Sequence, residues 1–135
     1  MHSWGAGMKI TALVARILLG LTFTVFGANG LHTFLPMPPP PPGLAGQYIG
    51  ALFQSHYTVV IFLVQLIGGL LLLVNRYVPF ALAILGPVLV NVLCFHTLML
   101  PAGLPLALVT TILWFILFYN YRRSFAGIFE AKPSV

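Results

Sequence analysis

Long apolar runs separated by short breaks of proline, glycine or charged residues form the main pattern of this sequence. Four such runs cover about residues 10–31, 57–74, 79–98 and 104–121. A helix needs roughly 20 predominantly apolar residues to cross a hydrocarbon core about 30 Å thick. The pattern therefore predicts an all-α polytopic membrane protein, in which four transmembrane helices form one bundle and residues 1–135 form a single membrane domain.

The segment between the first two runs, about residues 33–55, differs from the rest of the chain. It contains an unbroken proline run, Pro38 to Pro42. Proline has no amide proton and restricts the residue before it, so this stretch predicts a stiff polyproline II loop. Residues 44–55 mix apolar and polar side chains and are too few to span a bilayer. They predict a short helix that lies at the membrane interface.

The amino-acid composition supports a membrane setting. Of the 135 residues, 60% are hydrophobic and 5% are charged, whereas about a quarter of the residues in a typical soluble domain are charged. Six basic residues and one acid, Glu130, give a net charge of +5. The basic residues lie mostly at the ends of the apolar runs, where they set orientation. We therefore expect the lipid bilayer as a partner and no nucleic acid.

The positions of these basic residues predict the topology. Lys9, Arg76, Arg122, Arg123 and Lys132 flank the N-terminus, the break after the second run and the C-terminus. The two other breaks contain no lysine or arginine. The positive-inside rule then places both termini on the cytoplasmic side of the membrane, which we expect to be a bacterial inner membrane. Arg16 lies within the first run, where it could extend to the headgroups or pair with Asn120 or a carbonyl.

Polar side chains inside the apolar runs are costly in lipid and therefore informative. With a rise of about 1.5 Å per residue, the polar groups fall in the outer half of the predicted bundle. The candidate ligand-binding residues are Asn29, His32, Gln65, Asn91 and His96. Thr110 and Thr111 lie at a similar depth on the fourth run. One interpretation is a pocket that opens outward beneath the proline loop, and the other is interhelical hydrogen bonding.

The sequence does not decide whether the protein binds a quinone, a haem or no cofactor. His32 and His96 end the first and third runs, so their rings should lie at similar depth. Two neutral imidazoles on facing helices could ligate a haem iron. No acid accompanies them, and Cys94 is the one cysteine, which excludes a redox pair of cysteines within the chain. The sequence therefore predicts no catalytic residue and no other metal site.

Several short segments, taken in order, resemble DoxX-like membrane proteins. They are residues 15–21 (ARILLGL), 26–30 (FGANG), 65–73 (QLIGGLLLL), Arg76 and Pro79, Gly86-Pro87 through Asn91, Phe95-His96 and 101–104 (PAGL). The resemblance covers about residues 9–123 and implies a four-helix membrane bundle. Named members are associated with thiosulfate:quinone oxidoreductase and with oxidative-stress complexes, while most have no assigned reaction. The position held here by Gln65 is often glutamate in that family.

These features favour an accessory or structural subunit of a bacterial respiratory, photosynthetic or other redox membrane assembly, with other membrane subunits as partners and no enzymatic activity on its own. An alternative is an oxidoreductase subunit that binds quinone or haem in the outward-facing pocket. A further alternative is a small-solute carrier, although no inverted repeat or pair of broken helices is evident.

Overall fold

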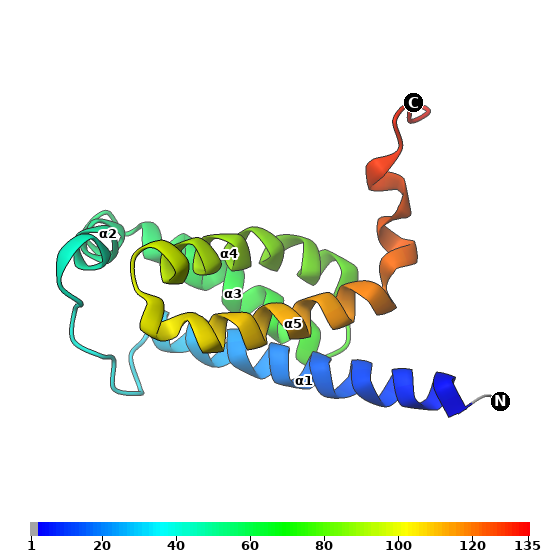
Figure 1. Cartoon of the computed structure of the whole chain (residues 1–135), viewed down its shortest axis with the longest axis horizontal. Coiled ribbons are helices and arrows are strands. Elements are labelled where there is room, and N and C mark those ends of the chain that lie inside the picture. Colours follow the sequence, from blue (N-terminus) through cyan, green and yellow to red (C-terminus); the bar gives the residue numbers. More distant parts are fainter. Residues whose placement is uncertain (1–2) are drawn as a thin grey trace.

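The computed structural model describes residues 3–135, and within these residues all the regular secondary structure is helical (Figure 1). The helices are α1 (Ser3–Leu31), α2 (Gly43–Gln54), α3 (Tyr57–Leu73), α4 (Val78–Leu98) and α5 (Leu104–Asn120), with 3₁₀ segments η1 (Pro101–Gly103) and η2 (Arg122–Phe129). The four predicted apolar runs match α1, α3, α4 and α5 to within one residue at seven of their eight ends. The exception is α1, which begins seven residues earlier than predicted because residues 3–9 continue the helix.

Three helical segments are long and apolar enough to cross a membrane by themselves: α1, α4, and η1 together with α5 as one continuous segment, Pro101–Asn120. α3 has 17 residues and reaches that length only together with α2, from which it is bent by 86°. The described residues thus contain three such spans, or four if the bent pair counts as one. Several apolar helices of this length are consistent with a multi-pass membrane protein.

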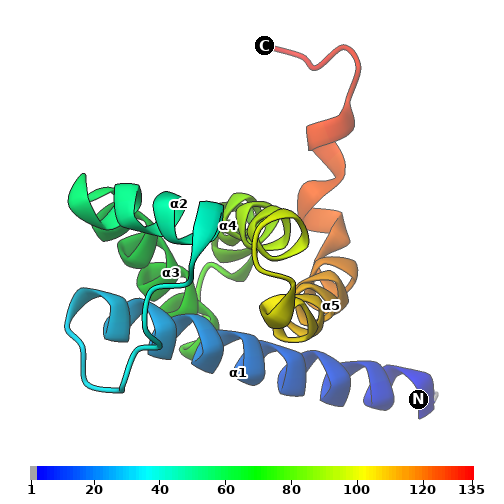
Figure 2. The same cartoon turned by 60° about the vertical axis from the view of Figure 1, so that its left-hand side comes forward.

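The four long helices lie side by side in the order α1, α3, α4, α5, and α5 returns to contact α1 (Figure 2). The most extensive contact is between α1 and α3. α1 and α4 each pack on α3 and α5 and lie diagonally across from one another. The apolar core between the helices is built from Ala15, Leu19, Phe23, Leu72, Val78, Ala81, Leu82, Leu85, Leu89, Leu117 and Phe125.

Glycines allow the backbones of α1 and α3 to approach closely. A Cβ atom added at Gly27 would lie 2.7 Å from the Leu66 amide nitrogen and 2.8 Å from the Phe62 carbonyl oxygen. A Cβ atom added at Gly69 would lie 2.5 Å from the Thr24 amide nitrogen. Small residues commonly mediate such close crossings between membrane helices, where van der Waals packing drives association. Side chains larger than hydrogen are therefore excluded at positions 27 and 69.

Arg16 links α1 to the C-terminal end of α3. Its guanidinium group donates hydrogen bonds to the carbonyl oxygens of Leu72, at 2.5 Å, and Leu73, at 3.2 Å. The last carbonyl groups of a helix have no partner within the helix, and they carry the negative end of its dipole. Of the alternatives open for Arg16, the structure therefore shows pairing with carbonyl groups of a neighbouring helix.

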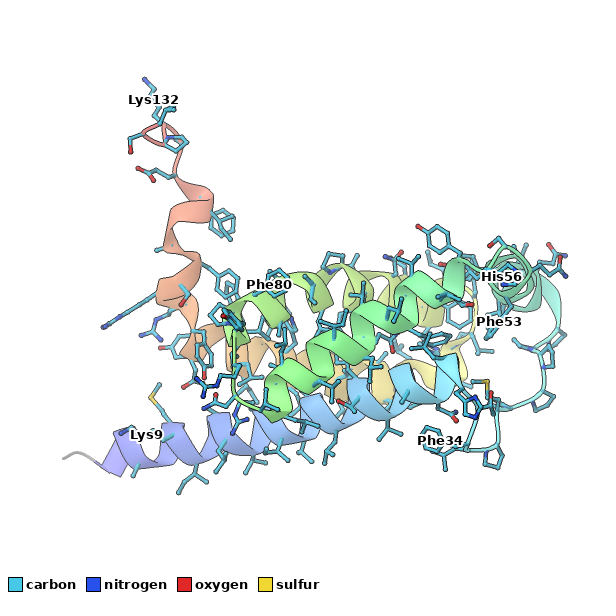
Figure 3. All side chains as sticks on the ribbon, turned by 180° about the vertical axis from the view of Figure 1, so that it is seen from behind. Lys9, Phe34, Phe53, His56, Phe80 and Lys132 are labelled. Atoms are coloured by element: carbon cyan, nitrogen blue, oxygen red, sulfur yellow. The ribbon has the colours of Figure 1, made fainter. Side chains whose placement is uncertain are left out.

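The two ends of the molecule differ in charge. Lys9 and Lys132 lie at one end, and Phe34, Phe53 and His56 lie at the other (Figure 3). The uncharged end carries the proline loop and α2, which lies across the ends of the long helices (Figure 1). α2 is held there by ring contacts of Tyr48 with Phe95, 5.6 Å between centroids, and of Phe53 with Phe62, at 6.3 Å.

Candidate functional site

An inner cavity of about 330 Å³ lies among all four long helices, in the half of the molecule that carries the proline loop. Small-molecule sites commonly enclose roughly 300–1,000 Å³ and combine apolar walls with a few polar groups. The walls are Thr22, Phe23, Phe26, Phe62, Gln65, Leu89, Val92, His96, Gly103, Leu106, Ala107 and Thr110. Three phenyl rings and several aliphatic side chains make most of this lining apolar, so its few polar groups decide what can bind.

Gln65 is the most informative of these polar groups. Its side chain is 8% exposed, lines the cavity, and makes no hydrogen bond to any residue that the structure describes. The Asn91 and Asn120 amides, in contrast, donate to carbonyl groups of their own helices. A buried amide without a partner costs free energy unless a ligand or water bonds to it. Gln65 therefore supplies one free donor group and one free acceptor to the cavity.

His96 supplies an acceptor to the same cavity. Its Nδ1 lies 3.0 Å from the Leu100 carbonyl oxygen. Since a carbonyl oxygen only accepts, Nδ1 carries the proton in the neutral ring and Nε2 is left as an acceptor. Gly103 makes room for the ring, because a Cβ atom at that position would overlap the imidazole. The turn after α4 thus fixes both the position and the tautomer of the histidine.

Thr110 completes the polar part of the lining. It is 7% exposed, and its hydroxyl donates to the Leu106 carbonyl oxygen at 2.8 Å. The hydroxyl proton is therefore used within α5, while the oxygen can still accept a hydrogen bond. Thr111, next to it in sequence, donates to Ala107 and lines neither this cavity nor the second one described below. The two threonines thus form a natural pair for comparison.

The structure does not unite the five residues that the sequence predicts as one pocket. Asn29 lies outside both cavities, and its Oδ1 accepts from the Phe34 and Leu35 amides at 2.9 and 2.8 Å. These hydrogen bonds connect the start of the proline loop to α1, so the Asn29 side chain stabilises the fold and does not face a cavity. His32 is exposed beyond the end of α1 and lines neither cavity.

His32 and His96 do not line a common cavity, so the structure gives no support to a haem site shared by the two rings. α1 and α4 lie diagonally, and only His96 faces a cavity. Within residues 3–135, no three histidine, cysteine or acidic side chains are grouped as metal ligands. Similar depth along two helices does not by itself make the two rings neighbours.

Asn91 belongs to a second, outer cavity of about 660 Å³ beneath α2. Its side chain is exposed, and its Nδ2 donates to the Pro87 carbonyl oxygen at 2.9 Å. Asn91 is therefore exposed and separate from the inner cavity, whereas Gln65 and Thr110 are buried. Gln65 lines both cavities and lies between them, together with Phe62 and Val92.

Sequence reasoning did not single out the aromatic walls of the inner cavity, Phe23, Phe26 and Phe62. Phenylalanines within an apolar run carry no signal that separates a cavity wall from lipid-facing surface. Gly103 also carries no such signal, although His96, seven residues before it, needs the space that the glycine leaves. Comparison with known protein families, with curated proteins and with solved structures gives no match to this chain.

Proposed function

We propose that this chain is a four-helix transmembrane bundle of the DoxX-like kind in a bacterial inner membrane, with both termini in the cytoplasm. The basic residues that flank the helices support this orientation. Lys9 and Lys132, although far from each other, both lie at the end of the molecule opposite His56 (Figure 3). Arg76 follows α3 and Arg122 follows α5, at the same end as the N-terminus of α1. Cytoplasmic ends of membrane helices carry such an excess of lysine and arginine.

Labelling of engineered cysteines tests the topology. In a background with Cys94→Ala, we expect Pro41→Cys and Ala102→Cys to react with a membrane-impermeant thiol reagent on intact spheroplasts. Asn75→Cys should react only after the membrane is opened, because it lies beside Arg76 at the basic end. Protection of positions 41 and 102 together with labelling of position 75 would reverse the proposed orientation.

Within this bundle, the function that the geometry favours is binding of a quinone-type ring in the inner cavity, preferentially in the reduced quinol form. The observation that carries the proposal is the Gln65 side chain, which is 8% exposed, lines the cavity and has no hydrogen-bond partner among the described residues. Its Nε2 can donate to one ring oxygen. His96 Nε2 can accept from a hydroxyl group, which only the reduced ring provides. The phenyl walls suit the flat ring.

Binding without chemistry of its own points to an accessory role. The sequence holds one cysteine, Cys94, and one acid, Glu130, and Glu130 lies beyond the last long helix. Neither supplies an electron carrier inside the bundle. We therefore propose that the chain presents the ring to a partner subunit of a redox assembly, and that the partner supplies or receives the electrons. The resemblance to DoxX-like proteins favours the same kind of assembly.

Equilibrium binding of a short-chain hydroquinone to the purified protein in detergent tests the binding step. Gln65→Leu removes one hydrogen bond at little change in size. We expect its Kd to rise about three- to tenfold, the effect of losing roughly one hydrogen bond. Thr111→Val serves as the control, because Thr111 lines neither cavity, and its Kd should equal that of the wild type.

Two results would contradict the proposal. Equal Kd values for the Gln65→Leu and Thr111→Val variants would show that hydroquinone does not bind in the inner cavity. Turnover of quinone by the isolated chain with a soluble electron donor would show an enzyme and exclude the accessory role. A partner that copurifies at fixed stoichiometry and carries its own redox centre is the result that the accessory role predicts.

A further inference from the structure

The outer cavity has the shape of a groove beneath α2. It is lined by residues of α2, α3 and α4. α2 itself lies across the ends of α3 and α4 (Figures 1 and 2). The contacts of Tyr48 with Phe95 and of Phe53 with Phe62 connect α2 to the two helices below it. Together with its volume of about 660 Å³, this arrangement gives a covered space that is large enough for a ligand.

The groove opens toward the side of the molecule that would face lipid. Val60 and Tyr57, both in its lining, are each 60% exposed, and Asn91 on the opposite wall is also exposed. These residues lie on α3 and α4, between which the opening runs. A hydrocarbon chain in the surrounding membrane could therefore enter from the side without crossing an aqueous phase.

Two buried polar side chains in this groove have no partner. Thr58 and Gln65 are each 8% exposed, and neither side chain hydrogen-bonds to another residue in the described part of the chain. They are seven residues apart, so they share one face of α3 at a spacing of about 10 Å along its axis. Asn91 adds an acceptor, because its Nδ2 is already bonded to Pro87. The occupant must offer hydroxyl or carbonyl groups to these positions.

The lack of charged side chains around the groove limits which polar groups the occupant can carry. None of the lining residues is lysine, arginine, aspartate or glutamate, and the sequence has none of these between residues 17 and 75 or between 77 and 121. An anionic headgroup would therefore meet no cation at this end of the protein. Desolvating a charge without a partner is strongly unfavourable. The polar end of the occupant is therefore uncharged.

We propose that the outer cavity binds one hydrocarbon chain of an uncharged lipid, whose hydroxyl or carbonyl groups hydrogen-bond to Thr58 and Gln65. The inference does not rest on the proposed quinol site, because it uses a separate cavity with its own opening. Gln65 touches both cavities, so binding in one can affect the other, but the residues that distinguish the two sites are different. Val60 and Thr58 line the outer cavity alone, and His96 lines the inner cavity alone.

Photocrosslinking tests the proposal. The full chain is placed in phosphatidylcholine nanodiscs with a monoacylglycerol that carries a diazirine in its acyl chain, and the labelled peptides are mapped by mass spectrometry. We expect labelling to concentrate on the groove walls. Val60→Trp fills the opening and should lower that labelling roughly tenfold, since several methylene groups lose their contacts. Val59→Trp is the matched control, because Val59 is 44% exposed on the same helix but lines neither cavity.

The remaining measurements separate the alternatives. Thr58→Val should weaken labelling while leaving the fold unchanged, and an acylglycerol competitor should displace the label more effectively than a fatty-acid anion. His96→Phe should leave labelling of the groove at the level of the wild type even where it removes quinol binding. Equal labelling of the Val60→Trp and Val59→Trp variants would overturn the proposal, as would equal competition by the anion. Loss of groove labelling in the His96→Phe variant would show that the hydrocarbon chain in the groove belongs to a ligand of the inner cavity. That result would also overturn the proposal of a separate lipid site.

Discussion

Replacing Gly27 by alanine is expected to destabilise the protein by about 1–3 kcal/mol, the usual cost of inserting a methyl group into a packed interface. The new Cβ atom would lie 2.7 Å from the Leu66 nitrogen and 2.8 Å from the Phe62 oxygen. Both atoms belong to the backbone of α3, so no side-chain rotation can relieve the contact. The two helices must separate, and their other contacts are then weakened. Thermal unfolding in detergent, followed by circular dichroism, measures the effect.

Gly7→Ala is the matched control for this prediction. Gly7 lies on the same helix, and apart from its own turn of helix no atom lies within 4 Å of the position of an added Cβ atom. Alanine is favoured over glycine in a helix by about 0.5–1 kcal/mol, so this variant should be slightly more stable than the wild type. The two substitutions are chemically identical and should have opposite signs. Destabilisation of similar size in both variants would contradict the close approach of α1 and α3.

Arg16→Leu is expected to have an effect of similar size, a loss of about 1–3 kcal/mol. The substitution leaves the Leu72 and Leu73 carbonyl groups without the guanidinium that bonds to them. It also removes the positive charge beside the C-terminal end of α3, where a cation is favourable. Arg16→Lys keeps the charge but loses the forked geometry, so its stability should lie between those of the wild type and the leucine variant. Unfolding in detergent again supplies the comparison.

Lys9→Leu separates this contact from a general effect of charge. Lys9 is an exposed basic residue on the same helix, and its side chain makes none of the hydrogen bonds seen in the structure. Its removal changes the net charge by the same amount as Arg16→Leu. We expect a change in stability below about 0.5 kcal/mol, typical of exposed sites. If the Arg16→Leu and Lys9→Leu variants lose the same stability, the hydrogen bonds from Arg16 to α3 do not contribute to the stability of the protein.

The helices could be predicted well because lipid imposes strong demands on sequence. Breaks such as Pro38 to Pro42 and the Pro101–Gly103 turn mark where apolar runs end, and the structure places helix ends close to them. The early start of α1 was missed because the apolar run was taken to begin after Lys9. Helix formation needs only backbone hydrogen bonds there, so the helix continues beyond the apolar run.

The site was harder to predict because depth along a helix says nothing about neighbours. His32 and His96 were correctly placed at one end of the molecule, yet α1 and α4 lie diagonally. The sequence also does not determine how each helix is rotated about its own axis. Asn91 and His96 are five residues apart, about 140° around α4, and the structure directs them to different cavities. Asn29 is explained by a local rule instead, since asparagine side chains often bond to nearby backbone amides.

The most direct test of the central claim is an experimental structure of the protein in a lipid bilayer with saturating hydroquinone. The account predicts density for a single ring in the inner cavity, with one ring oxygen within hydrogen-bond distance of Gln65 Nε2 and a hydroxyl group near His96 Nε2. An empty inner cavity, with Gln65 bonded to a neighbouring helix and the ring bound elsewhere or not at all, would contradict it.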